Sequence, residues 1–197
     1  MSATTLFNYE LHFVSEALGQ LKDYLLSDEV FWQLNLRSLH GASPYPQMTL
    51  GNLLLSQARL EGLKQGAGLS QENQQELKEI NADIASIKKE WRSAWEKKAE
   101  REFRSRLTQW ERFLDEIGDS PDRHSSNYAT EVRVRAILSL LEADLPASAA
   151  AFKSQVALQD QRLERMVSNA DFVWDAEVKN AFPKADFWYL YIQSKIR

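Results

Sequence analysis

Apolar side chains recur at helical spacing along most of the chain, and this pattern predicts an all-α fold. The longest such stretch runs from Gln71 to Ile117 without a Gly or Pro. Its apolar positions repeat about every 3.6 residues, the period of a straight α-helix, whereas a two-stranded coiled coil needs about 3.5. They are Leu77, Ile80, Ile84, Ile87, Trp91, Trp95, Ala99, Phe103, Leu107, Trp110, Leu114 and Ile117. We therefore predict one long central helix over about residues 71–117.

Both ends of this helix carry the residues that usually begin and end helices. Ser70 is a favourable N-cap, and Gly118 followed by Pro121 is typical of a helix end. A helix of this length would span about 70 Å. Between Ile87 and Leu107 the apolar residues advance by steps of four only. That change favours lateral packing by several shorter helices over a continuous coiled coil.

Shorter amphipathic stretches flank the long one and predict the helices that pack on it. Leucine spacing and turn residues place them at about residues 8–26, 50–65, 127–144 and from Pro146 to about Ser168. The segment after Asn169 is less regular and rich in aromatic residues, which would expose much apolar surface unless the segment docked on the helices. We predict a single domain over residues 1–197, an all-α bundle of five to six helices with this aromatic C-terminal segment docked on the long helix.

Composition excludes several classes of protein. The chain has no cysteine, which excludes disulfides, thiolate catalysis and cysteine-bound metals. The N-terminus lacks the basic and apolar regions of a signal peptide, so we expect a cytoplasmic protein. The longest uncharged stretch, from Ser38 to Ala58, contains prolines and several polar residues, and we predict no membrane span. The net charge of −4 disfavours a general attraction to nucleic acid.

Catalytic and metal-binding motifs are missing from the sequence. Its histidines are His12, His40 and His124, and none is paired with a second ligand at helical spacing. The chain also has no nucleophile elbow, Walker loop or dinucleotide-binding fingerprint. We therefore predict no enzymatic activity, no cofactor and no metal.

The segment from Lys88 to Arg106 mixes basic and aromatic residues, as nucleic-acid grooves do. Its aromatic residues fall on the apolar stripe, however, and should be buried in the core. Its charges also stand four residues apart with opposite sign, as in Arg92 with Glu96 and Glu100 with Arg104. We expect a solvated, self-paired helix surface here, with nucleic acid an unlikely partner.

Two charged residues interrupt the apolar face of the long helix. Glu102 and Arg106 fall inside the arc that Trp91, Trp95 and Phe103 occupy, where solvated charges are not expected. Arg133 likewise lies beside apolar positions of the following helix. We predict a partly buried network of Glu102, Arg106 and Arg133. It either fixes the register of the packed helices or binds an anionic ligand through the spare arginine.

Aromatic residues predict a second candidate site. Trp91 and Trp95 from the long helix, with Trp188 and Tyr189 from the C-terminal segment, form the possible wall of a pocket. The alternative is that these side chains only seal the core.

Three functions remain open on this basis. The first is a non-enzymatic helical interaction or scaffold protein that self-associates as a homodimer or binds another protein, because short helices would leave part of a long apolar stripe uncovered. The second is a helical bundle that binds a small molecule, such as an anion, at Glu102, Arg106 and Arg133. The third is a weak nucleic-acid-binding module.

Overall fold

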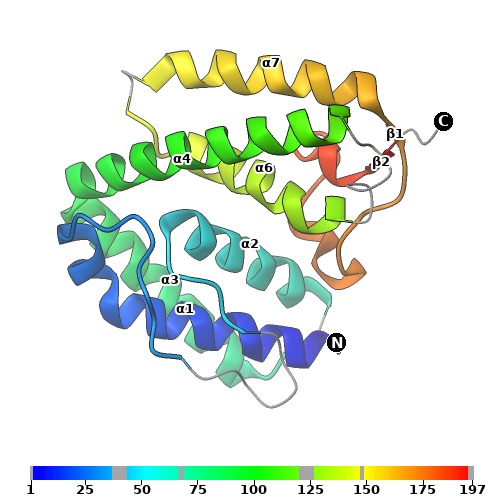
Figure 1. The fold of residues 1–197 in the computed structure, drawn as a ribbon. Coiled ribbons are helices and arrows are strands. Elements are labelled where there is room, and N and C mark those ends of the chain that lie inside the picture. The colour runs from blue at the N-terminus through cyan, green and yellow to red at the C-terminus, as the bar shows by residue number, and fades with distance from the viewer. Residues whose placement is uncertain (1, 37–43, 67–68, 120–126, 147–148, 195–197) are drawn as a thin grey trace.

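The protein is a bundle of packed α-helices, which confirms the predicted all-α class (Figure 1). The computed structural model describes residues 2–36, 44–66, 69–119, 127–146 and 149–194. The helices are α1 (Ala3–Leu26), α2 (Leu50–Gly66), α3 (Gln71–Glu90), α4 (Arg92–Asp119), α6 (Tyr128–Glu142) and α7 (Ala150–Met166). They agree with the predicted elements to within a few residues at most ends, except in the long central helix.

Helix α2 lies at the centre of the bundle and is buried on most of its sides. It contacts α1, α4 and α6 as well as the C-terminal segment. Its leucines at positions 50, 53, 55, 60 and 63 are all fully buried. Helix α1 packs on α2 and α3, whereas α4 packs on α6 and α7, so that α2 joins the two groups of helices.

The prediction of one long central helix is wrong, because the chain changes direction at Trp91. The backbone there leaves helical geometry (φ −106°, ψ 32°), and α3 and α4 run in different directions on either side of it (Figure 1). The hydrogen bonds continue through the bend: Trp91 N–H donates to Ile87 O over 2.8 Å, and Trp95 N–H donates to Trp91 O over 2.9 Å. The break is therefore a bend in a nearly continuous helix.

The stepping of the apolar residues accounts for this bend. Each step of four turns the apolar stripe by about 40° around the helix, so the four steps from Ile87 to Phe103 carry it most of the way to the opposite face. A straight helix would present these residues to different sides. With the bend, α3 buries Ile80 and Ile84 where it packs on α1, and α4 buries Phe103 and its neighbours where it packs on α6 and α7.

A carboxylate from a distant part of the chain holds the two sides of the bend together. Asp144, which follows α6, is buried and pairs with Lys88 of α3. Its other oxygen accepts a hydrogen bond of 2.9 Å from the indole Nε1 of Trp95 on α4. Asp144 therefore fixes the relative position of α3 and α4.

The aromatic C-terminal segment docks on the helices, but mainly on α2 and α6 and not on the long helix of the prediction. Strands β1 (Val167–Asn169) and β2 (Ile192–Ser194) form an antiparallel hairpin that encloses two 3₁₀ helices, η3 (Ala176–Ala181) and η4 (Trp188–Leu190). Hydrogen bonds connect this segment to α6: among them, Tyr128 Oη donates to the carbonyl of Tyr189 over 2.8 Å, and Trp174 Nε1 donates to that of Ala129 over 2.7 Å.

Candidate functional site

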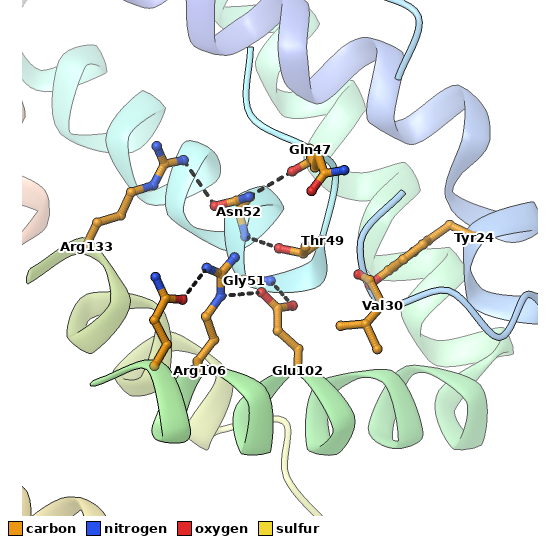
Figure 2. Close-up of polar contacts among 10 residues, drawn as sticks. Tyr24, Val30, Gln47, Thr49, Gly51, Asn52, Glu102, Arg106 and Arg133 are labelled. Atoms are coloured by element: carbon orange, nitrogen blue, oxygen red, sulfur yellow. Dashed lines mark hydrogen bonds and ion pairs between the residues drawn. The ribbon is translucent and has the colours of Figure 1, made fainter. Parts of the chain in front are cut away.

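Glu102 of α4 is fully buried and binds the first turn of α2. Its Oε2 accepts a hydrogen bond of 2.8 Å from the backbone N–H of Gly51 (Figure 2). The first N–H groups of a helix have no partner within the helix and attract negative charge. Thr49 serves another of these groups, because its Oγ1 accepts from the N–H of Asn52 over 3.0 Å. Glu102 and Thr49 together complete the N-terminus of α2.

Arg106 pairs with Glu102 one helical turn away. Its Nε donates to Glu102 Oε1 over 3.2 Å, and its Nη1 lies 3.3 Å from Gln109 Oε1 (Figure 2). The guanidinium also lies over the ring of Phe31, with its carbon 5.4 Å from the ring centre. Both oxygens of Glu102 therefore accept hydrogen bonds, and the Glu102–Arg106 part of the predicted network is fully paired within the protein.

Arg133 of α6 reaches the same turn of α2 without contacting Glu102. Its Nη2 donates to the side-chain oxygen of Asn52 over 3.1 Å, and Asn52 in turn donates to the carbonyl of Gln47 over 2.8 Å (Figure 2). The Nε of Arg133 is buried and has no hydrogen-bond partner among the residues that the structure describes. Among the described residues no carboxylate forms an ion pair with Arg133, so a neutral amide is its only hydrogen-bonded neighbour.

Burial and neighbouring charges act against the positive charge of Arg133. Burial, reinforced by repulsion from Arg59 and Arg106, lowers the pKa of Arg133 to about 10, although Glu10 partly opposes the shift. A group with that pKa keeps its proton at neutral pH. The interior between α1, α2 and α6 therefore contains a positive charge that no ion pair compensates.

Two residues that the sequence did not predict, Glu10 and Arg59, complete this charged interior. Glu10 of α1 is only 2% exposed, and its Oε1 accepts a hydrogen bond of 2.9 Å from Arg59 Nη1 on α2. A signal for Glu10 was present, because it stands between the buried Phe7 and Leu11 on the apolar face of its helix. No comparable pattern marks Arg59.

Two tyrosines border the same interior. The rings of Tyr9 and Tyr45 are stacked with their centres 4.4 Å apart, and Tyr9 Oη donates to the carbonyl of Pro44 over 3.1 Å. The hydroxyl of Tyr45 is buried and has no hydrogen-bond partner in the described part of the chain. Burial, with smaller contributions from Tyr9 and Glu10, raises the pKa of Tyr45 to about 12, so its hydroxyl remains a neutral donor.

The four aromatic residues predicted to wall a pocket lie in two separate places. Trp91 borders a groove of about 720 Å³ between the end of α1 and the start of α4, while Trp95 is buried against Asp144. Trp188 packs on Tyr189 at 5.9 Å, and the hydroxyl of Tyr189 is 2.8 Å from Ser139 Oγ of α6. No ring contact or hydrogen bond recorded for the described residues joins the two pairs.

Three basic residues of the stretch from Lys88 to Arg106 pair with a glutamate of the same stretch. Arg92 binds Glu96 over 2.8 Å and Arg104 binds Glu100 over 2.6 Å. Lys98 instead turns inward, where its ammonium binds Ser27 Oγ over 3.1 Å and the carbonyl of Glu29. Trp95 and Phe103 are buried as well. These side chains are therefore not presented for stacking on bases.

Neither a metal site nor a membrane helix adds a candidate among the described residues. The described part of the chain holds no cluster of three or more His, Asp or Glu residues suited to a metal ion. Within the same ranges, every helix is too short or too polar to cross a membrane. His12 packs edge-on against Tyr45 at 5.6 Å, whereas His40 and His124 lie outside the described residues. Comparison with protein-family models, curated proteins and solved structures gave no match to this chain.

Proposed function

We propose that this protein is a helical bundle that binds a small anion at Arg133, between α1, α2 and α6. The observation that supports this function is the largely buried positive charge of Arg133, whose only hydrogen bond among the described residues goes to the neutral side chain of Asn52. A charge buried without a partner is costly, and such groups are candidates for functional sites. A bound anion would supply both a negative charge that compensates Arg133 and a hydrogen-bond acceptor for its Nε.

The two neighbouring arginines differ from Arg133, because each of them pairs with a carboxylate. Arg106 is paired with Glu102, and Arg59 is paired with Glu10. Arg133 lies close enough to both for their charges to lower its pKa, yet it has no carboxylate of its own. Arg133 is also partly exposed, which would allow a small ligand to reach it from solvent. We place this function in the cytoplasm, with which the lack of cysteine is consistent.

Self-association was predicted because a long apolar stripe would remain uncovered. In the described structure, every position of that stripe except Ile87 and Trp91 is buried within the chain itself. Leu26 is 62% exposed and borders the same groove as Trp91, but apolar surface of this extent is normal on proteins. The apolar stripe therefore favours neither the homodimer nor a protein partner over anion binding.

Thermal unfolding in the presence of simple anions tests the proposed function. We would compare sodium acetate, methanesulfonate and sulfate at constant ionic strength, for the unaltered protein and for Arg133→Met. A ligand that binds only the folded state should raise Tm by roughly 5 °C or more at about 100 times its Kd. We expect at least one anion to do so for the unaltered protein and none to do so for Arg133→Met.

Arg104→Met is the matched control, because it removes an arginine from the exposed pair with Glu100. This variant should keep the full response to anions. If Arg133→Met fails to fold, Arg133→Lys provides the second comparison, since it keeps the charge but loses the planar donor group and should bind more weakly. The proposal is wrong if no anion raises Tm of the unaltered protein, or if the Arg133 variants respond as fully as Arg104→Met.

A further inference from the structure

The groove between the end of α1 and the start of α4 has an apolar part that is open to solvent. This part is formed by Leu25, Leu26, Trp91 and Ala94, in a groove of about 720 Å³. Leu26 is 62% exposed and Trp91 is half-buried. A small ligand needs a site that covers most of its surface, whereas an open groove can receive the side chains of a peptide. The shape of the groove therefore favours a protein segment over a small molecule.

Basic side chains form a row along one wall of this groove. Lys97, Arg101 and Arg104 of α4 are spaced three or four residues apart, so they share one face of the helix over about 10 Å of its length. Within the row, Arg104 pairs with Glu100 over 2.6 Å, and Arg101 lies 3.7 Å from Asp28. The row begins one turn after Ala94, so it is adjacent to the apolar part of the groove.

Two lysines give the groove an excess of positive charge. The third carboxylate of its lining, Glu90, pairs with Lys22 of α1 over 3.8 Å, so each of the three carboxylates has a cation of its own. Lys97 is exposed, and the buried Lys98 is held by a hydroxyl and a backbone carbonyl, which are both uncharged. Neither lysine forms an ion pair with any residue that the structure describes.

We infer that this groove docks an acidic, apolar segment of a partner protein, with carboxylates along Lys97 and Arg101 and apolar side chains on Leu26 and Trp91. Complementary charge attracts an acidic segment to the unpaired Lys97 and disfavours a basic one. The apolar contact removes Leu26 and Trp91 from water. A nucleic-acid strand fits less well, because the carboxylates of the same groove would repel its phosphates. No residue of this lining belongs to the anion site proposed at Arg133, so the two proposals are independent.

Peptide selection tests the chemistry of the partner. Random peptides of about 12 residues, displayed on phage, are selected on the unaltered chain after depletion on Lys97→Glu. Lys97 is exposed, so this variant should keep the fold. We expect the enriched peptides to carry a net negative charge and more than one large apolar residue. The inference is wrong if no peptide remains after depletion, or if the enriched peptides are neutral or basic.

Fluorescence anisotropy with one enriched peptide tests the residues that we assign to the groove. Arg101→Glu should weaken binding by at least about 10-fold, whereas Arg112→Glu, at an exposed position of α4 outside the groove, should leave it unchanged. Leu26→Ser should also weaken binding by roughly 10-fold. Its matched control is Leu158→Ser, because Leu158 is 56% exposed on α7. Equal effects within either pair of variants would overturn the inference. An oligothymidine of the same length that binds more tightly than the peptide, and is weakened by Arg101→Glu, would assign the groove to nucleic acid instead.

Discussion

Gly51 and Glu102 approach each other so closely that no side chain fits between α2 and α4 at this point. The backbone N–H of Gly51 donates to Glu102 Oε2 over 2.8 Å. A Cβ atom at Gly51 would lie 2.7 Å from Glu102 Oε1 and 2.2 Å from Cγ2 of Ile137 on α6. Both distances are well below van der Waals contact. The missing side chain of Gly51 therefore lets three helices meet.

Gly51→Ala should destabilise the protein. The added methyl group would force Ile137 and Glu102 apart, and overpacking of this kind lowers the free energy of unfolding by about 2 kcal/mol. Urea unfolding measures the effect. Gly19→Ala is the matched control, because Gly19 lies in helix α1 with open space around it. That substitution should raise the free energy of unfolding by about 0.5–1 kcal/mol, since alanine is the better helix former. Changes of the same sign in the two variants would contradict this account of Gly51.

Removal of the Glu102 carboxylate should be costly, although the charge lies within an internal ion pair. In Glu102→Ala, the Gly51 N–H and the Arg106 guanidinium both lose an acceptor in a buried place, and the free energy of unfolding should fall by about 3 kcal/mol. Glu100→Ala removes a carboxylate with the same spacing to an arginine on the same helix, but that pair is exposed. Glu100→Ala should lower the free energy of unfolding by less than about 0.5 kcal/mol. Similar losses for the two variants in urea unfolding would show that Glu102 does not support α2.

The charged interior could be predicted only where a charge interrupts an apolar pattern. Glu102 and Arg106 were recognised in this way, and Glu10 carries the same signal on α1. Arg59 and Asn52 carry no such signal, because their importance depends on which helices meet at α2. Tyr45 lies in a proline-containing segment without periodicity, and only the fold places it beside Tyr9 and Glu10.

The bend at Trp91 shows a different limit of prediction. The sequence contains no Gly or Pro between Gln71 and Ile117, and local preference alone favours a continuous helix. The sequence shows apolar residues four apart around Trp91. This change of period does not say whether the helix bends or whether neighbouring helices pack on different faces of a straight one. Asp144 helps to decide the outcome by contacting both sides of the bend, and such a contact between distant parts of the chain depends on tertiary structure.

Substitution of Asp144 should weaken the connection between α3 and α4. In Asp144→Ala the buried indole N–H of Trp95 loses its acceptor, and the free energy of unfolding should fall by about 2 kcal/mol. Asp144→Asn keeps an acceptor oxygen while losing the charge that pairs with Lys88, so its loss should be smaller. Asp115→Ala is the control, since Asp115 pairs with Arg162 at an exposed position. Urea unfolding should show the largest loss of stability for Asp144→Ala, a smaller loss for Asp144→Asn and the smallest for Asp115→Ala. An equal loss for Asp144→Ala and Asp115→Ala would contradict this role of Asp144.

The link between α6 and α7 depends on the planar shape of an arginine. Arg135 donates to both oxygens of Asp160, over 2.8 and 2.7 Å, and its guanidinium carbon lies 4.5 Å from the ring centre of Tyr189. Arg135→Lys keeps the charge but cannot form both hydrogen bonds and the stacking contact together, so the free energy of unfolding should fall by about 2 kcal/mol.

Arg162→Lys is the matched control for Arg135→Lys, because Arg162 also joins α7 to a neighbouring helix through an aspartate. Its side chain is 38% exposed, compared with 8% for Arg135. Exposed ion pairs contribute about 1 kcal/mol or less, and much of that contribution disappears at high salt. In urea unfolding at low and high salt, Arg135→Lys should lose stability to a similar extent in both conditions, whereas Arg162→Lys should change little. A loss for Arg135→Lys that vanishes at high salt would mean that charge, and not the planar geometry, joins α6 to α7.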